Sequence, residues 1–347
     1  MEGKVKVLIV DDSKIVRETL KSILTKDPVI EVIGEAEDPF EAAHIIKKEV
    51  PDVITLDIEM PKMNGLTFLR KIMSQFPIPT IIVSTLSVKG SEVAMKALKF
   101  GAVDFYTKSE IDLTGDLEDA TFELISKVRT ASAIKVKRIT PKSVKPKAPT
   151  FDTADLSFDQ GKVVLIGSST GGTEAILKVL RDLPANFPPV AIVQHMPPVF
   201  TEQFAHRLND ECAMNVVEAK EGIRMKRGQV IVAPGDFHMV LVNSGMGLSV
   251  DVNQNEKVNR HRPSVDVLFD STESLGSNFV GVILTGMGND GANGLLRLKN
   301  KGVYTIAQDK ESSVVYGMPK AAFELGAVNE VLALDKISER LVDLLKV

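Results

Sequence analysis

The chain has 347 residues, of which 44% are hydrophobic and 25% charged, and its formal net charge at pH 7 is −4. This length exceeds one ordinary hydrophobic core and predicts two domains, and the slightly acidic balance gives no reason to expect a nucleic-acid or membrane surface. The single cysteine excludes an internal disulfide, and no apolar run approaches the roughly 18 residues of a membrane span, so we expect a cytoplasmic protein.

Five short apolar runs alternate with amphipathic stretches in the first third of the chain. The runs are VKVLIV, IEVIGEA, DVITLDI, TIIVST and VDFYTK, and the stretches between them, such as SKIVRETLKSILTK, space their apolar residues three and four apart. That spacing is the helix period. Strand–helix alternation repeated five times predicts a parallel sheet with helices on both faces.

Polar residues end or follow the strands of this predicted sheet, where parallel sheets bind ligands. Three carboxylates in one crevice repel one another unless a cation lies among them, and such hard oxygen ligands suit Mg²⁺. A lysine and a hydroxyl beside them are suited to hold phosphate oxygens. Strand ends are often polar, so one aspartate alone would predict no site. The residues concerned are Asp11, Asp12, Asp57, Ser84 and Lys108.

This arrangement resembles the receiver domain of bacterial response regulators over residues 1–125. The resemblance implies that Asp57 is the phosphoryl acceptor, attacking as a carboxylate nucleophile. It also implies a Mg²⁺ site formed by Asp11, Asp12 and Asp57 together with the backbone carbonyl of Glu59. A histidine kinase would be the phosphodonor.

The same resemblance implies three residues that respond to phosphorylation. Lys108 would contact the phosphate, Ser84 would move toward it, and Phe105 occupies the position of the switch aromatic of the family. One departure is visible, because Ser109 stands where the family usually has proline after the lysine. This puts the cis peptide of the family in doubt but leaves the chemistry in place.

Composition changes over residues 131–150, ASAIKVKRITPKSVKPKAPT, which contain six basic residues, three prolines and no acidic residue. The prolines favour an extended, solvated chain, and the segment has neither a helix nor a strand period. We therefore predict a linker over residues 126–155, with domains over 1–125 and 156–347. A basic tether that contacts an acidic partner is the alternative.

Four further apolar runs, KVVLIG, PVAIVQH, FVGVILTG and VYTIAQD, each precede a helical stretch in the second half. Between them, GQVIVAPGDFHMVLVNSGMGLSVDV predicts several strands with tight glycine turns, expected to be antiparallel. This half is too long for the compact helical DNA-binding module that many receivers control. We predict an α/β protein with two doubly wound parallel-sheet domains, a (βα)5 receiver and a Rossmann-like domain with an antiparallel β insertion.

The loop GSSTG, residues 167–171, joins a predicted strand to a predicted helix. It is no Walker P-loop, because no Gly-Lys-Ser/Thr follows, and it lacks the Gly-x-Gly-x-x-Gly spacing. Its Gly-x-Ser-x-Gly spacing instead allows Ser169 to sit on a sharp turn with its oxygen exposed, as a nucleophile would. Small residues are common at such turns, so the pattern by itself leaves phosphate binding open.

A serine nucleophile needs a base, and histidine is the usual one near neutral pH. Of the five histidines, His195 alone comes directly at a strand end. His44 and His206 belong to predicted helices, and His238 and His261 lie in or near the insertion.

Asp290 follows a third strand and a glycine-rich turn, just before a predicted helix. A helix N-cap is an ordinary role for such an aspartate, but a carboxylate here can also orient an imidazole. Ser169, His195 and Asp290 each follow a different strand and can face one crevice, as acyl transfer requires. The backbone N–H of Met287, in the glycine-rich turn, is a candidate oxyanion donor.

The blocks IGSSTGGTEAI, QHMPPVFT, VAPGDFHM, HRPSVDVLF and ILTGMGNDGA resemble the signature blocks of the chemotaxis-specific protein-glutamate methylesterases. Together with the receiver, the resemblance covers the chain apart from the linker. It implies that Ser169 is the nucleophile, His195 the general base and acid, and Asp290 the orienting carboxylate. The segment NRHRP, with Arg260, His261 and Arg262, would meet acidic receptor helices or form a solvated loop cap.

The implied activity is hydrolysis of glutamate γ-methyl esters on chemoreceptors, releasing methanol, with deamidation of receptor glutamines as a second reaction. The ester chemistry needs no cofactor. We expect a monomer without membrane insertion, whose unphosphorylated receiver covers the catalytic crevice. Two alternatives stay open: a receiver-controlled module whose serine loop binds phosphate or a nucleotide, and an adaptor that docks onto receptors without acyl chemistry.

Overall fold

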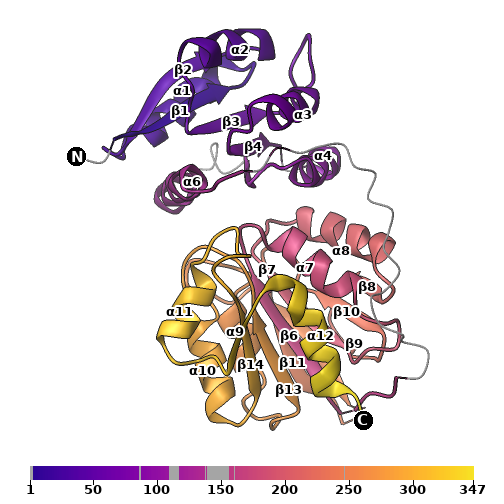
Figure 1. The fold of residues 1–347 in the computed structure, drawn as a ribbon. Helices are drawn as coiled ribbons and strands as arrows, with labels where there is room; N and C mark the ends of the chain where they lie inside the picture. Colours follow the sequence, from indigo (N-terminus) through magenta and orange to yellow (C-terminus); the bar gives the residue numbers. More distant parts are fainter. Residues whose placement is uncertain are drawn as a thin grey trace. The chain divides into compact units, whose positions relative to one another are not determined.

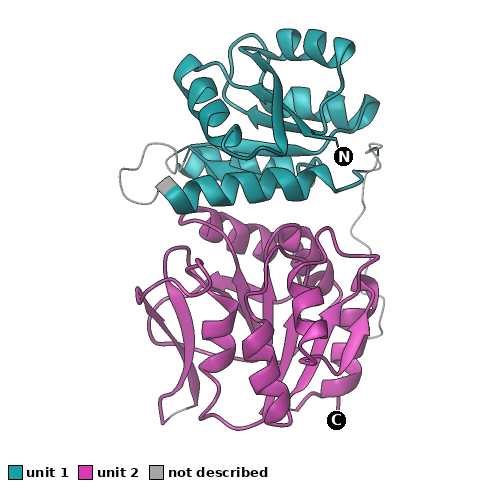
Figure 2. Ribbon diagram, turned by 90° about the vertical axis from the view of Figure 1, so that its left-hand side faces the viewer, with its two compact units in different colours: residues 1–143 teal, residues 144–347 magenta. Residues whose placement is uncertain are grey.

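The computed structural model describes residues 3–85, 87–108, 117–136, 138, 156–159, 161–245 and 247–347. Its contacts divide the chain into two compact units, Met1–Ser143 and Val144–Val347 (Figure 2). Each unit is built on a parallel sheet with helices, which confirms the predicted α/β fold class. Within the described part of the chain, every helix is too short or too polar to span a lipid bilayer.

The N-terminal unit holds a five-stranded parallel sheet in the order β2-β1-β3-β4-β5 (Figure 1). Its strands are β1 (Val5–Val10), β2 (Ile30–Ala36), β3 (Val53–Asp57), β4 (Thr80–Ser84) and β5 (Asp104–Thr107). The central strands β3 and β4 are buried along their whole length, as expected for a sheet covered on both faces. The helices are α1 (Lys14–Leu24), α2 (Pro39–Lys48), α3 (Gly65–Gln75), α4 (Val88–Lys99) and α6 (Leu117–Ser132).

Helix α6 corrects the boundary between the first domain and the linker. We expected the linker to begin at residue 126, but the helix continues to Ser132. Val128 and Ala131 are fully buried in the core of the N-terminal unit, and Ile134 and Val136 pack against it. Apolar residues at helical spacing thus continue beyond residue 126 and keep the chain on the domain. Residues 139–155 of the expected linker lie outside the described residues.

The C-terminal unit holds a seven-stranded parallel sheet in the order β15-β14-β13-β6-β7-β10-β8. Its strands are β6 (Val163–Ser168), β7 (Val190–Gln194), β8 (Asn215–Glu218), β10 (Gln229–Val232), β13 (Phe279–Ile283), β14 (Tyr304–Gln308) and β15 (Glu330–Leu332). Helix α7 contacts α8 and α12, and α10 contacts α9 and α11 (Figure 1). These helices are α7 (Gly172–Arg181), α8 (Phe200–Glu211), α9 (Val265–Asp270), α10 (Ala292–Asn300), α11 (Met318–Glu324) and α12 (Leu334–Leu345).

The predicted antiparallel insertion is present but smaller than expected. Strands β11 (His238–Asn243), β12 (Leu248–Asn253) and β9 (Ile223–Arg224) form a three-stranded antiparallel sheet in that order. The QVIV segment, which we assigned to the insertion, is instead β10 and pairs in parallel with β7 and β8. Its last three residues form an uninterrupted buried apolar run, which is typical of a parallel strand covered on both faces.

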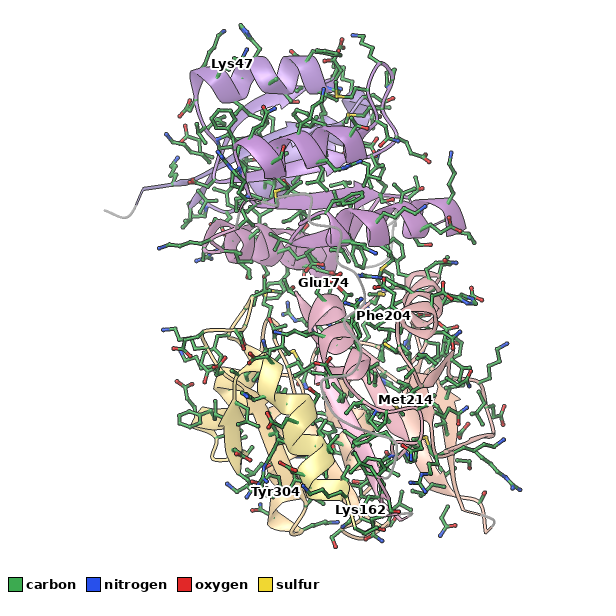
Figure 3. All side chains as sticks on the ribbon, turned by 45° about the vertical axis from the view of Figure 1, so that its right-hand side comes forward. Lys47, Lys162, Glu174, Phe204, Met214 and Tyr304 are labelled. Atoms are coloured by element: carbon green, nitrogen blue, oxygen red, sulfur yellow. The ribbon has the colours of Figure 1, made fainter. Side chains whose placement is uncertain are left out.

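Side chains that face a sheet are buried, and side chains on the outer faces of the helices are exposed. Phe204 on α8 is fully buried, whereas Lys47 on α2 reaches into solvent (Figure 3). In the C-terminal unit, β6 is the first strand in the chain and lies between β7 and β13. The strand order therefore reverses at β6, and the carboxyl ends of these three strands form the crevice where doubly wound sheets bind ligands.

We predict that Gly167→Ala destabilises the C-terminal unit. A Cβ at Gly167 in β6 would clash with both γ-methyl groups of Val265 on α9. Overpacking of this kind costs about 1–3 kcal/mol. Hydrogen exchange of the β6 amides should therefore become faster, while the control Gly161→Ala, whose nearest neighbour lies 3.5 Å away, should leave it unchanged. Equal exchange in both variants would contradict the tight contact between α9 and β6.

Candidate active site and receiver site

Ser169 lies in the short loop between β6 and α7. Its backbone N–H donates to the carbonyl of Thr285 at 3.1 Å, and its own carbonyl accepts from the N–H of Gly172 at 2.7 Å. The left-handed conformation that the turn needs falls on Gly171, with φ 79°, and Ser169 itself is not left-handed. The loop thus holds a half-buried serine in a relaxed backbone at the centre of the crevice.

Gln194, the last residue of β7, ties this loop to the next strand. Its Nε2 donates to the carbonyl of Ser169 at 2.9 Å and to that of His195 at 3.1 Å. Its Oε1 accepts a hydrogen bond from the hydroxyl of Ser168 at 2.7 Å, and Ser168 is fully buried. A Cβ at Gly172 would clash with this amide, which explains the second glycine of the loop.

His195 and Asp290 meet directly, as the sequence predicted from their strand ends. The Nε2 of His195 lies 2.8 Å from Oδ2 of Asp290, and both side chains are buried. Because an ionised carboxylate only accepts, Nε2 carries the proton and Nδ1 is left as the basic nitrogen. Nδ1 is buried and has no hydrogen-bond partner among the described residues.

Asp290 accepts four hydrogen bonds besides that of His195. They come from the hydroxyl of Ser264 (2.8 Å), the backbone N–H groups of Val265 (2.6 Å) and Asp266 (3.3 Å), and the Nδ2 of Asn259 (2.7 Å). Burial by itself would raise the pKa of Asp290, but the hydrogen bonds and the charge of the imidazole outweigh it and hold the pKa well below its usual range. The carboxylate therefore stays ionised and can stabilise an imidazolium at His195.

Ser169 and His195 follow neighbouring positions of paired strands. Ser168 is paired with Gln194, and the N–H of His195 donates to the carbonyl of Ser168 at 3.1 Å. Among the described residues, no hydrogen bond joins the Ser169 hydroxyl to His195. Catalytic hydrogen bonds are often long in proteins without substrate and shorten when substrate binds, so this geometry is compatible with a triad.

The glycine-rich turn after β13 lies against the serine. A Cβ at Gly286 would come within 2.9 Å of Ser169 Cβ and 3.0 Å of its nitrogen. Gly317 approaches the same turn closely, since its Cβ would lie 3.2 Å from Met287 Cα. Met287, the predicted oxyanion donor, thus belongs to a turn that touches Ser169.

The segment between β12 and α9 contributes more to the site than its sequence predicted. Asn259 and Ser264 bind Asp290, and the ring of His261 lies on that of His195, with centroids 3.7 Å apart and planes at 14°. Arg262 instead pairs with Asp236 at 2.6 Å, and Arg260 is exposed. The sequence signals here were the block HRPSVDVLF and the segment NRHRP, and neither directly follows a strand end.

In the N-terminal unit, three carboxylates converge as predicted. One oxygen each from Asp11, Asp12 and Asp57 lies within 4.8 Å of the others. Lys108 Nζ lies 2.8 Å from Asp57 Oδ2 and 2.9 Å from Asp11 Oδ2. Burial and the charge of Asp57 raise the pKa of Asp11, and although burial opposes it, the two carboxylates raise the pKa of Lys108. One ammonium cannot balance three carboxylates, so these residues fit a divalent cation.

The predicted switch residues lie on the paired strands β4 and β5. Ser84 is buried at the end of β4 and its hydroxyl donates to the carbonyl of Gly90 at 3.3 Å. Phe105 is buried on β5, with Lys127 Nζ 5.5 Å from its ring centroid. Glu59 is exposed, and its N–H donates to Asp57 at 3.3 Å. Ser109, and with it the predicted departure from a cis peptide, lies outside the described residues.

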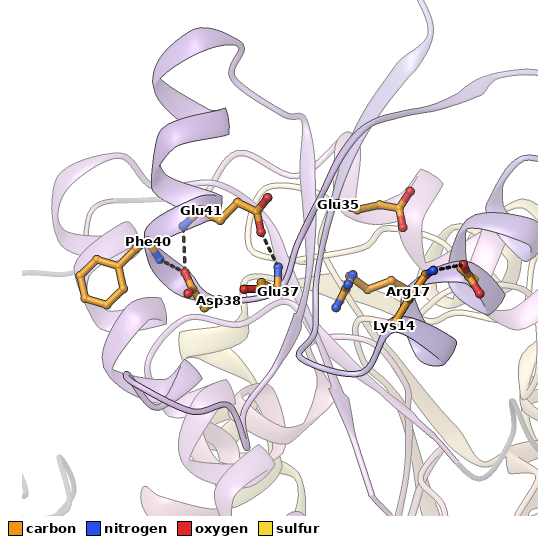
Figure 4. Close-up of a pocket in the computed structure, with 8 residues that line it drawn as sticks. Lys14, Arg17, Glu35, Glu37, Asp38, Phe40 and Glu41 are labelled. Atoms are coloured by element: carbon orange, nitrogen blue, oxygen red, sulfur yellow. Dashed lines mark hydrogen bonds and ion pairs between the residues drawn. The ribbon is translucent and has the colours of Figure 1, made fainter.

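Each unit has a hollow at its surface among the described residues. The first, of about 570 Å³, lies between α1, β2 and α2 and is lined by acidic residues with Lys14, Arg17 and Phe40 (Figure 4). Its charges are largely satisfied locally, since Asp38 caps α2 and Glu41 accepts from the N–H of Glu37. The second, of about 300 Å³, lies in the C-terminal unit beside Gly171 and Thr285, next to the serine loop.

Comparison with known proteins bears on both units. The family model for CheB methylesterase matches residues 164–341, and that for the response regulator receiver domain matches residues 7–114. A protein-glutamate methylesterase/protein-glutamine glutaminase of Cupriavidus metallidurans is 47% identical over 98% of this chain and 96% of its own length. A protein with the same name from Geobacter metallireducens is 46% identical over 98% of this chain and 99% of its own.

Among solved structures, the CheB methylesterase catalytic domain of Thermotoga maritima matches the C-terminal part of this chain. The two are 44% identical, the TM-score is 0.52, and the match covers 54% of this chain and 100% of that domain.

We predict that Asp290 makes the C-terminal unit sensitive to acid. Because the folded-state pKa of Asp290 lies below the roughly 3.9 of an unfolded aspartate, its contribution is fully present above about pH 5 and is lost as pH falls through the folded-state value. Asp290→Asn should lower the free energy of unfolding at neutral pH. It should also make that free energy decrease less steeply as the pH is lowered. Urea unfolding at several pH values, read by hydrogen exchange in β13, checks this. The exposed control Asp210→Asn should keep the wild-type slope, and an equal slope in Asp290→Asn would contradict the assignment.

Proposed function

The chain belongs to the CheB methylesterase family and carries a response regulator receiver domain, and from this premise we propose that it hydrolyses glutamate γ-methyl esters on chemoreceptors. Methanol is the product, and deamidation of receptor glutamines, which releases ammonia, is the second reaction of the same site. The relatives that are named for both activities match nearly the whole chain. The observation that carries the proposal is the buried His195–Asp290 pair, which follows the strand paired with that of Ser169 and leaves Nδ1 of His195 without a hydrogen-bond partner among the described residues.

The proposed reaction begins with attack of Ser169 Oγ on the ester carbonyl carbon. Nδ1 of His195 takes the hydroxyl proton, and Asp290 stabilises the resulting imidazolium through its hydrogen bond to Nε2. The carbonyl oxygen becomes an oxyanion, for which the N–H of Met287 is the donor we propose. Collapse of the tetrahedral intermediate breaks the bond to the methoxy oxygen, which leaves as methanol with the proton from His195.

A second, equivalent half-reaction regenerates the enzyme. Water attacks the acyl-serine while His195 accepts its proton, and the same proton then returns to Ser169 as glutamate is released. With glutamine as substrate, ammonia takes the place of methanol. All of these steps use residues at the carboxyl ends of β6, β7 and β13, and none needs a cofactor.

Two other functions were open on sequence grounds. A loop that only bound phosphate or a nucleotide would need no basic nitrogen held beside it, and an adaptor would need no buried charge at Asp290. The five hydrogen bonds that fix this carboxylate favour acyl chemistry, because they place charge where an imidazolium forms.

We further propose that phosphorylation of Asp57 controls the esterase, with a histidine kinase as donor. Asp11, Asp12 and Asp57, together with the carbonyl of Glu59, would hold Mg²⁺, which when bound offsets the negative charge of carboxylates and phosphoryl oxygens. Lys108, already bonded to Asp57, would contact the phosphoryl group. Ser84, on β4, would move toward the phosphoryl group, and Phe105, on β5, would act as the switch aromatic.

Ser169→Ala should abolish methanol release. Loss of a triad nucleophile lowers turnover by several orders of magnitude, about 10⁴-fold or more, because no other hydroxyl replaces it. Methanol release from methylated receptor is the measurement, and Ser277→Ala, which removes an exposed serine of the same unit, is the control. Substantial activity in Ser169→Ala would refute the nucleophile assignment and reopen the ligand-binding alternative.

Asp57→Asn should abolish the increase in methanol release that a small phosphodonor and Mg²⁺ produce. The amide cannot accept a phosphoryl group as the carboxylate does, so the receiver stays in its unphosphorylated state. Asp52→Asn, which alters an exposed carboxylate beside the other end of β3, should keep the increase. A phosphodonor response that survives in Asp57→Asn would place the regulatory site elsewhere.

A further inference from the structure

A tight turn between the insertion and α9 brings two side chains into contact with the catalytic pair. Asn259 contacts Asp290, and His261 contacts His195. Val258 and His261 exchange backbone hydrogen bonds of 3.1 and 2.9 Å. The two residues between them, Asn259 and Arg260, are both left-handed, with φ of 52° and 68°. These are the features of a two-residue type I′ turn, which fixes the directions of its flanking side chains. A left-handed arginine is uncommon and indicates that the surroundings impose this conformation.

Asn259 uses both hydrogens of its side-chain amide to bind carboxylates. Its Nδ2 donates to Asp290 Oδ1 at 2.7 Å and to Asp266 Oδ2 at 2.8 Å. The other oxygen of Asp266 accepts from the N–H of Gly294 at 2.6 Å, and burial raises the pKa of Asp266. Asn259 thus links α9 to the loop of Asp290, and Asp266 links both of them to α10.

His261, the last residue of the turn, covers the ring of His195. The centroid distance of 3.7 Å and the angle of 14° describe a face-to-face stack. The edge of the His195 ring is held at Nε2 by Asp290, and its face is held by His261. A single hydrogen bond leaves rotation of the ring about that bond open, whereas a stacked plane removes it.

We propose that the Val258–His261 turn is a clamp that sets the orientation of the catalytic imidazole, with His261 as a positioning residue for His195. The proposal rests on the proposed function and deepens it, because it names the groups that hold the ring of His195 at its edge and at its face. The stack requires His261 to remain neutral when His195 becomes imidazolium, since two charged rings this close repel each other. The other charged groups around the pair are Asp290, Asp266, the exposed Arg260, and Arg262 with its partner Asp236.

The test compares His261→Ala, which removes the ring, with His261→Phe, which keeps a flat ring without a titratable nitrogen. In the full chain, His261→Ala should lower kcat on the order of 100-fold with KM little changed, because a misdirected base slows the chemical step and leaves substrate binding intact. His261→Phe should recover most of the loss. The control His206→Ala removes an exposed histidine of α8 and should behave as wild type.

A second readout is independent of esterase activity. With ¹⁵N-labelled histidine, wild type and His261→Phe should show His195 as the Nε2–H form with a proton protected by Asp290, and His261→Ala should lose this protection. Wild-type kcat in His261→Ala, or equal loss in His261→Phe and His261→Ala, would overturn the stacking role. If wild type released no methanol, the proposed function would fail, and the His195 signals would still decide whether the clamp exists.

Discussion

The catalytic half of this molecule depends on one buried negative charge. Asp290 follows β13 in the interior of the unit, where an unpaired carboxylate would be strongly unfavourable. Five donors from three segments of chain meet it, and one of them is the imidazole of His195. The same contacts that make the charge tolerable also fix the imidazole tautomer, so the requirement of folding and the requirement of chemistry are satisfied by one network.

The sheet order explains why so few residues suffice. Because β6 lies between β7 and β13, the residues that follow these strands are neighbours although they are separated by up to 121 positions, from Ser169 to Asp290. Small residues then permit close approach: Gly286 comes against Ser169, and Gly172 makes room for the amide of Gln194. The receiver uses the same principle, with Asp11, Asp57 and Lys108 at the ends of β1, β3 and β5.

Much of this could be predicted from the sequence, because strand-end positions follow from apolar runs alone. The convergence of the three receiver carboxylates and the contact of His195 with Asp290 are both of this kind. The contributions of Asn259 and His261 could not be predicted, since both residues belong to a left-handed turn that does not directly follow a strand end. Strand β10 is only four residues long, so its short apolar run did not by itself separate a parallel strand from the insertion that follows it. Helix α6 continues past residue 126 because Val128 and Ala131 have a core to cover.

In the proposed mechanism, the buried His195–Asp290 pair activates Ser169. The most direct measurement is labelling with a fluorophosphonate, which reacts with activated serines, followed by mass spectrometry of the modified peptides. We expect one adduct, on Ser169, that stops methanol release and fails to form in His195→Gln. An adduct on another residue, or undiminished methanol release from protein fully labelled at Ser169, would contradict it.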